Sequence, residues 1–563
     1  MPMPTTTVFD SIPQEVLENI AFFAVASNPI GPPRELLAFL LVNRRFYSML
    51  SSSSNPYFHS RIFATKFDTS ALIRRLGPEA ATPPKLAMEL RRRWVQLGRL
   101  RARAGCTVGS LAAVAGGGNR SAGGGGGEGE GEEGESGGGG GGGGGRGGGG
   151  GLTEEAMRAL HEMLWTAYLM MLENDGLNER QLREYAQLNG WLHTFWFAED
   201  GASCAQLAIR DNAWPPNNDL SAVTMWLFWF LLRPEEFFAL DDAEFRNAIS
   251  ILKLLALGAH QYPVCRPAWV DFVPNQTVGR NAAPPAYAEY PPLSPPPLAA
   301  PAVLSYLSLA PRSSTGIDAL QPMSPLAPSS VSLQAFRMSF EWDCEWERCK
   351  RLAGSDTPTV ESPTGTFKPG TMEGIWEGLF TYTEFTAYAA LLSGAPPPTL
   401  NKSLVARHQQ TWRLHEYHLL LPEDHDDGLY VPGSSTTATT TTTRIEEDPR
   451  YRPLSPGDPL RAYLPYGLSI EQERNGLSVH EPGRVMDTFY HRCPAPEQIT
   501  REYNRRVREI LIAGELDGDR GKWLYRGYFV GDAQGNYTGR WRDTLSPAEV
   551  LGYEGCFFMG RRR

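Results

Sequence analysis

Cysteine is scarce in this chain, and the seven that occur have no regular spacing. An odd number of irregularly spaced cysteines forms no disulfide framework, so we expect free thiols in a reducing compartment, the cytoplasm, the nucleus or both. Long apolar runs are missing too. The most apolar stretch, residues 223–232, is well short of the roughly 20 residues that cross a bilayer, and polar residues interrupt the apolar residues of the first predicted helix. We therefore expect no membrane association and no signal peptide.

An excess of positive charge is also missing, since the formal net charge is −10 at pH 7. Proteins that bind nucleic acid in general present a basic face to the phosphates, so this balance argues against nucleic acid as a partner. The basic runs at residues 91–93 and 561–563 are short. We interpret the first as a solvated helix face and the second as a solvated tail.

Motifs of catalysis are missing as well. The sequence has no Gly-x-Ser-x-Gly turn, no phosphate-binding Gly-x4-Gly-Lys-Ser/Thr loop and no His-Glu-x-x-His. Four histidines at 408, 415, 418 and 425 lie near acidic residues at 424, 426 and 427, but their spacing matches no zinc pattern, so we predict a polar loop. Cys344 and Cys349 are interpreted as thiols on a helix. The sequence thus indicates no catalytic residue, metal or cofactor.

What is present divides the chain by composition and period, and the pattern indicates an α+β protein. The predicted segments are an N-terminal helical module at 8–66, a further helix at 84–105, a Gly-rich tether at 116–151, a helical region at 152–262, a Pro-rich linker at 263–332 and a β-rich region at 333–563. Both linkers are predicted to be disordered, because their glycines and prolines bury too little apolar surface to offset the entropy of ordering.

In the middle region the apolar residues recur with the helical period, in segments 179–198, 220–232 and 241–258. Asp241 or Asp242 is placed to cap the last of these, and Gly258 to end it. Aromatic residues such as Trp191, Phe195 and Trp226 are dense here, and at helical spacing they indicate a filled core rather than a cofactor pocket.

Toward the C-terminus the period changes from helical to two, after a helix predicted at 333–353. Residues 374–382 alternate as a strand does, residues 521–543 have the pattern of a hairpin, and residues 553–559 form another predicted strand. We therefore expect a mainly antiparallel domain that is barrel-like or sandwich-like.

At the N-terminus three short helices are predicted. Pro13 suits a first helical turn, and Asn43 can cap the third helix. So small a unit cannot bury all of its apolar residues internally, so the apolar stripe must pack on the rest of the chain or on another protein.

Two stretches of this module carry a resemblance to a known family. Residues 12–20 read Ile-Pro-Gln-Glu-Val-Leu-Glu-Asn-Ile, and residues 40–46 read Leu-Leu-Val-Asn-Arg-Arg-Phe. They resemble the opening and the third helix of the F-box, and the aromatic segment Asn-Pro-Tyr-Phe at 55–58 follows as it does there. Two departures are an insertion at residues 26–33 and Phe46 where tryptophan is common. The overall build resembles large F-box proteins of filamentous fungi.

The resemblance implies a function without chemistry of its own. F-box proteins bind a Skp1-like adaptor and through it a cullin, and present a protein substrate for ubiquitination, so we expect a substrate receptor of an SCF-type ubiquitin ligase whose substrate is unknown. Two alternatives are a scaffold that binds the adaptor outside any ligase and an enzyme with a site in the C-terminal β domain. The residues that the resemblance assigns to adaptor binding are Ile12, Pro13, Glu15, Val16, Leu17, Ile20, Leu40, Leu41, Val42, Arg44 and Phe46.

The substrate site is expected far from the adaptor, in the β-rich region. Alternation along a strand turns some side chains outward, and exposed Trp, Tyr and Arg are common in interfaces. The alternative is that the aromatic residues fill the domain and the arginines solubilise its outside. The residues predicted to bind substrate are Trp376, Tyr382, Arg526, Tyr528, Arg540 and Trp541.

Overall fold

The structure is a computed structural model. It describes residues 12–111, 154–258, 293–295, 298–310, 338–354, 374–402, 405–419, 477–479, 488–492, 523–531, 536–543 and 554–561. The Gly-rich tether predicted at 116–151 lies outside these residues, as do most of the Pro-rich linker and His425 with its neighbouring aspartates.

The N-terminal module and its connection to the rest of the chain are helical, as predicted. The elements are α1 (Gln14–Ala26), α2 (Arg34–Leu40), α3 (Arg44–Leu50), α4 (Pro56–Lys66), α5 (Ser70–Leu76), the 3-10 turn η2 (Pro78–Ala81) and α6 (Pro83–Arg101). The predicted cap is confirmed, because the Asn43 side chain accepts a hydrogen bond of 2.8 Å from the backbone N–H of Phe46. Asn55 caps α4 in the same way, accepting from Phe58 at 3.0 Å.

A second group of helices forms the body of the molecule. It comprises α8 (Glu154–Leu172), α9 (Leu177–Arg180), the π-helical turn η4 (Gln181–Tyr185), α10 (Leu188–Phe197), α11 (Ala205–Arg210), α12 (Asp219–Leu231), α13 (Pro234–Phe238) and α14 (Asp242–Leu257). Asp241 caps α14 through its carboxylate, and the helix ends before Gly258, both as predicted. Trp191, Phe195 and Trp226 are buried, which confirms the prediction that they fill a core.

One further helix corrects the prediction of a linker at 263–332. Within it lies α15 (Ala299–Leu309), all of whose side chains are buried. The helix packs against α12 and α14 and also against strands of the C-terminal sheet. The prediction rested on the prolines that precede this helix. Residues 299–309 are apolar, and burying them between two layers offsets the entropy cost of ordering them.

The C-terminal region begins with the 3-10 turn η8 (Ser339–Trp342) and α16 (Asp343–Gly354), which carries Cys344 and Cys349 as free thiols. Antiparallel strands follow, with α17 (Phe385–Leu392) and α18 (Pro398–Lys402) between the first two. The strands are β1 (Gly374–Thr383), β2 (Val405–Leu419), β3 (Leu477–Val479), β4 (Thr488–Arg492), β5 (Trp523–Val530), β6 (Asn536–Asp543) and β7 (Glu554–Arg561).

The strands pair in the order β3-β2-β1-β7-β6-β5, with β4 also paired to β2. The predicted strand at 374–382, the hairpin of β5 and β6 and the final strand are confirmed. The polar loop predicted around the histidines is wrong over residues 405–419, which form β2 and pair along the whole of β1. The described strands form one antiparallel sheet, so the α+β class holds.

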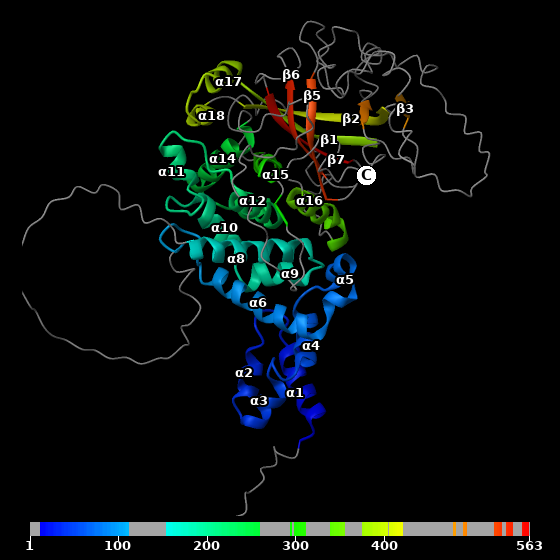
Figure 1. Cartoon of the computed structure of the whole chain (residues 1–563). Coiled ribbons are helices and arrows are strands. Elements are labelled where there is room, and N and C mark those ends of the chain that lie inside the picture. Colours follow the sequence, from blue (N-terminus) through cyan, green and yellow to red (C-terminus); the bar gives the residue numbers. More distant parts are fainter. Residues whose placement is uncertain are drawn as a thin grey trace, which may run out of the picture.

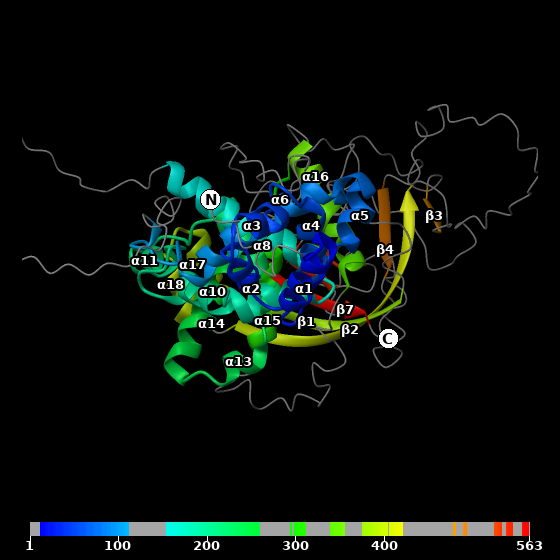
Figure 2. The same ribbon diagram turned by 90° about the horizontal axis from the view of Figure 1, so that it is seen from below.

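Figure 1 shows how these parts are arranged. Helices α1–α3 lie at one end of the molecule, the helices of the body fill the middle, and β1, β2, β5, β6 and β7 lie at the opposite end. Viewed from below, α1, α2 and α3 are the elements nearest the viewer, in front of the body helices (Figure 2). The N-terminal module and the sheet are thus separated by the helical body.

Candidate protein-binding surface

Helix α1 has two apolar faces rather than one. Leu17, Ala21 and Val25 face inward and are buried, with Leu17 only 2 % exposed. Val16 and Ile20, each 47 % exposed, and the more exposed Phe23 follow a second stripe along the helix. The residues of each stripe are three or four positions apart, as residues on one helical face must be. The inner stripe holds the module together, and the outer one is free to meet a partner.

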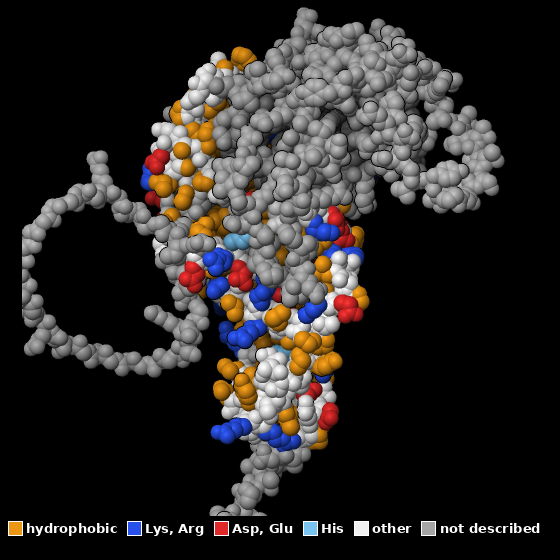
Figure 3. Space-filling view, viewed as in Figure 1, with side chains coloured by type: hydrophobic (Ala, Val, Ile, Leu, Met, Phe, Trp, Pro, Cys, Tyr) orange, Lys and Arg blue, Asp and Glu red, His pale blue; other side chains and the backbone are white. Residues whose placement is uncertain are grey.

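Helices α2 and α3 repeat this division. Leu36, Phe46 and Leu50 are buried in the module, whereas an outer set is exposed, with Leu41 the most exposed at 75 %. The large exposed apolar residues of α1, α2, α3 and the turn between α2 and α3, here called the outer apolar face, are Val16, Ile20, Phe23, Leu37, Leu41, Val42 and Tyr47. Apolar side chains gather over this end of the molecule in the space-filling view (Figure 3).

The predicted adaptor residues therefore divide into three groups. Leu17 and Phe46 are core residues, which corrects their assignment, because a side chain that packs α1 on α3 offers no surface to another protein. Ile12 and Leu40 are partly buried against that core. The exposed members are Pro13, Glu15, Val16, Ile20, Leu41, Val42 and Arg44.

Three residues of the outer apolar face were not among the predicted adaptor residues: Phe23, Leu37 and Tyr47. Leu37 is 59 % exposed, although Leu36 beside it on α2 is buried. The spacing 16, 20 and 23 along α1 was a signal for Phe23. Nothing comparable marks Leu37 or Tyr47, whose helices have only seven residues each.

The loop between α1 and α2 attaches the module to the body. The side chain of Gln181, wholly buried in η4, accepts from the Gly31 N–H at 2.9 Å and donates to the Pro29 carbonyl at 2.7 Å. It also donates to the Lys66 carbonyl at 3.0 Å, while the Lys66 ammonium donates to the Asn28 carbonyl. These bonds use the insertion at residues 26–33, so this departure from the family pattern has a structural role.

A buried cluster of charges lies beside this attachment. Arg93, 1 % exposed, donates to Glu89 at 3.0 Å, to Glu173 at 2.6 Å and to the Asn178 side chain at 3.3 Å. Its guanidinium also lies 5.0 Å from the ring centroids of Phe63 and of Phe67. The cluster thus joins α4 and α6 to the end of α8 and to α9.

The charges of the cluster stabilise one another. Burial alone would raise the pKa of Glu89, but the charges and hydrogen bonds of Arg92 and Arg93 lower it to about 2. Arg92 pairs with Glu89 at 2.8 Å and donates to Thr166 at 2.9 Å. The prediction of a solvated basic face at 91–93 is therefore wrong for Arg92 and Arg93, which form ion pairs inside the protein.

Asp68 completes the joint between the module and the body. Its carboxylate accepts from the backbone N–H groups of Asp175, Leu177 and Asn178, at 2.9 to 3.1 Å. Burial raises the pKa of Asp68, and these hydrogen bonds partly offset the rise. A carboxylate at the start of α9 is favourable because the amides of the first helical turn have no partner within the helix.

Three of the six predicted substrate residues, Trp376, Arg540 and Trp541, are not available on the surface of the sheet. Trp376, Arg540 and Trp541 are at most 1 % exposed, which contradicts their prediction as an exposed grip. The Arg540 guanidinium donates to the Ala256 carbonyl at the end of α14 at 2.8 Å, and the Trp541 indole donates to the Thr381 carbonyl at 3.0 Å. Tyr382 is half-buried against Trp541, with ring centroids 4.8 Å apart.

The cause is that the central strands are covered on both faces. Consecutive residues of β6 and β7 are buried, so alternation turns none of the described ones outward. The side chains of Arg526 and Tyr528 lie outside the described residues; their strand positions pair with Arg540 and Thr538.

Every described helix is too short or too polar to cross a lipid bilayer. No group of three or more His, Cys, Asp and Glu side chains lies close enough to hold a metal ion in this part of the chain.

No family model matches the chain, and neither a curated protein nor a solved structure matches it.

Proposed function

We propose that this chain is the substrate-recognition subunit of an SCF-type ubiquitin ligase, in which residues 12–66 act as an F-box. The module binds a Skp1-like adaptor, and the adaptor links the chain to a cullin. The remainder of the chain presents a protein substrate, and no residue of the chain performs chemistry. The proposal places the protein in the cytoplasm, the nucleus or both.

The observation that carries the proposal is the outer apolar face. The module buries Leu17, Phe46 and Leu50 in its own core. It still leaves seven large apolar residues exposed on α1, α2, α3 and the turn between α2 and α3. Large exposed apolar side chains gathered at one end of a protein are typical of protein interfaces. Central anchors in such interfaces are each worth about 2 kcal/mol or more.

The arrangement of the molecule also supports the proposal. The outer apolar face belongs to the end of the molecule opposite the sheet (Figure 1). A receptor needs such a separation, because its substrate must reach the conjugating enzyme on the far side of the adaptor. Catalysis is then a matter of proximity, since tethering raises the local concentration of the substrate.

Affinity capture tests the proposal with a matched pair of variants. Ile20→Glu with Leu41→Glu places two charges on the outer apolar face without touching the core. Met88→Glu with Val95→Glu makes the same change at two similarly exposed positions of α6. We expect the first variant to lose the Skp1-like adaptor and the cullin together and the second to keep both.

The partners that the unaltered chain captures decide between the alternatives. An adaptor captured with a cullin supports the ligase subunit. Capture of the adaptor without any cullin favours a scaffold that uses the adaptor outside a ligase. Capture of neither, or equal capture of both by the two variants, contradicts the proposal.

A further inference from the structure

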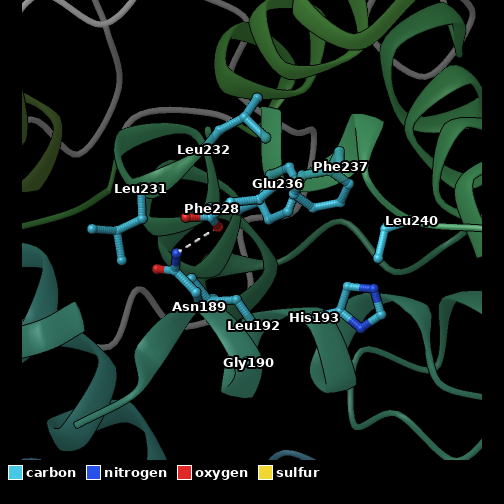
Figure 4. A pocket seen from close by; sticks show the side chains of 10 residues that line it. All are labelled: Asn189, Gly190, Leu192, His193, Phe228, Leu231, Leu232, Glu236, Phe237 and Leu240. Carbon is cyan, nitrogen blue, oxygen red and sulfur yellow. Dashed lines mark hydrogen bonds between the residues drawn. The ribbon is translucent and has the colours of Figure 1, made fainter. Parts of the chain in front are cut away.

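A pocket of about 220 Å³ opens between α10, α12 and α13, in the helical body. Its lining is mostly aliphatic and aromatic, and the close-up view shows three polar side chains among these groups (Figure 4). The apolar lining residues are Leu192, Phe228, Leu231, Leu232, Phe237 and Leu240, and the polar ones are Asn189, His193 and Glu236. None of these residues belongs to the N-terminal module or to its attachment.

The volume limits what the pocket can hold. An apolar cavity of about 150 Å³ accepts a benzene ring, whereas drug-sized ligands occupy about 300 Å³ or more. A space of about 220 Å³ lies between these limits and suits a ring system of one or two rings. The walls favour an aromatic occupant, because Phe228 and Phe237 stand edge to face with centroids 5.5 Å apart and offer ring edges and faces.

The polar side chains define the other property of the occupant. The Asn189 amide nitrogen donates to Glu236 at 3.1 Å, which leaves the amide oxygen as an acceptor. This oxygen and the Nε2 of His193 are buried and have no hydrogen-bond partner among the described residues. Buried polar atoms without partners are uncommon and costly, so each calls for a group that the pocket receives.

The state of His193 agrees with an uncharged occupant. Burial lowers the pKa of His193, so its imidazole is neutral at pH 7. The Glu236 carboxylate lies 3.8 Å from the Arg183 guanidinium, so the negative charge of Glu236 is paired within the protein. The pocket therefore offers an acceptor, the amide oxygen of Asn189, without an unbalanced charge.

We propose that this pocket binds a neutral aromatic ring system of about the size of indole that carries a hydrogen-bond donor. The ring packs against Phe228 and Phe237, and its N–H or O–H donates to the free oxygen of Asn189. The same chemistry arrives as a free small molecule or as a tryptophan side chain of another protein. The site goes beyond the adaptor surface, which lies at the end of the molecule.

Calorimetric titration of the full chain with indole tests the proposal, with indene as the isosteric ring that lacks the donor. We expect saturable binding of indole, and binding of indene weakened about tenfold because the buried amide oxygen of Asn189 stays unpaired. Asn189→Leu removes one acceptor and should narrow this preference to about threefold or less. Absence of indole binding, or equal affinity for indene and indole in the unaltered chain, overturns the proposal.

A second pair of variants locates the binding. Leu240→Trp fills the pocket from its half-buried rim, and Leu207→Trp adds the same bulk at an exposed position of α11. Indole affinity should fall at least tenfold in the first and stay unchanged in the second. Equal affinity in both variants places indole elsewhere and overturns the proposal. Unchanged circular dichroism and thermal unfolding serve as folding controls for both.

A peptide titration distinguishes the two sources of the ring, a free small molecule and a tryptophan side chain of another protein. The blocked peptide Gly-Gly-Trp-Gly-Gly is titrated beside indole into the full chain. Binding at least as tight as that of indole, lost in Leu240→Trp, identifies a protein side chain as the occupant. Binding of indole without the peptide identifies a free small molecule.

Discussion

Replacing Arg93 by methionine should loosen the joint between the N-terminal module and the helical body. Methionine keeps much of the length and apolar contact of arginine but removes the guanidinium, which donates to Glu89, Glu173 and Asn178. Glu173 is 1 % exposed, so its carboxylate then faces an apolar side chain in a site closed to water. The loss therefore includes the cost of a buried charge as well as three hydrogen bonds.

Removing one partner of a buried ion pair costs about 3–5 kcal/mol. Since about 1.4 kcal/mol is a factor of ten, the local opening that exposes α4 and α6 should become roughly 10²- to 5 × 10³-fold more frequent. Hydrogen exchange followed by mass spectrometry measures this directly, as faster exchange of amides in α6. The C-terminal sheet, which contacts the cluster nowhere in the described contacts, should keep its exchange rates.

Two further variants decide whether the reasoning is right. Arg93→Met together with Glu173→Leu removes both charges, so most of the lost protection should return. Arg180→Met breaks an exposed pair with Glu184, so it should change the free energy of local opening by less than about 1 kcal/mol. If Arg93→Met exchanges no faster than Arg180→Met, the buried cluster does not hold the joint.

Four other outcomes are expected. Gly31→Ala, at a φ of +81° and with Tyr185 3.1 Å from the new Cβ, should speed exchange in the α1–α2 loop. Leu17→Ala should cost about 2–5 kcal/mol of module stability, measured by proteolysis. Acidification from pH 4.5 toward 2 should destabilise the α6 joint. The pKa of Glu89 is lower in the folded chain than in the unfolded one, so the ionised carboxylate stabilises the fold above the unfolded pKa, and this stability is lost as Glu89 protonates. Glu89→Gln should flatten the pH dependence in urea titrations. Gly378→Ala should disrupt the β1–β7 pairing, seen by circular dichroism, because its Cβ would meet the Phe558 carbonyl.

Local sequence signals predicted much of the secondary structure. The caps at Asn43 and Asp241 follow from side chains that bond the amides of the next turn, and these depend on neighbours alone. The alternation at 374–382 and the hairpin at 521–543 were equally local. The helix α15 was missed because its ordering depends on two layers from distant parts of the chain.

The candidate surface was predicted only in part, for a related reason. A run of apolar residues on α1 indicates that the helix is amphipathic, but not which of two adjacent stripes packs on α3. Leu17 and Phe46 form the core because the packing of α1, α2 and α3 on one another turns these two side chains inward. The hydrogen bonds from Gly31 to Gln181 and from Arg93 to Glu173 join residues 150 and 80 positions apart, and no short-range pattern indicates such pairs.

The burial of Arg540 and Trp541 has the same origin. Alternation predicts an outward face when one side of a sheet meets water, and here both sides of the central strands are covered. An arginine with a backbone carbonyl of α14 as partner cannot be told from a surface arginine by its neighbours in the sequence.

The most direct test of the central claim is the dissociation constant between the full chain and a purified Skp1-like adaptor, measured by calorimetry. Ile20→Glu with Leu41→Glu should raise this constant at least 100-fold, because two central anchors of about 2 kcal/mol each are lost and two charges enter an apolar contact. Met88→Glu with Val95→Glu should leave it within about twofold. A dissociation constant unchanged by charges on the outer apolar face would contradict the assignment of that face to the adaptor.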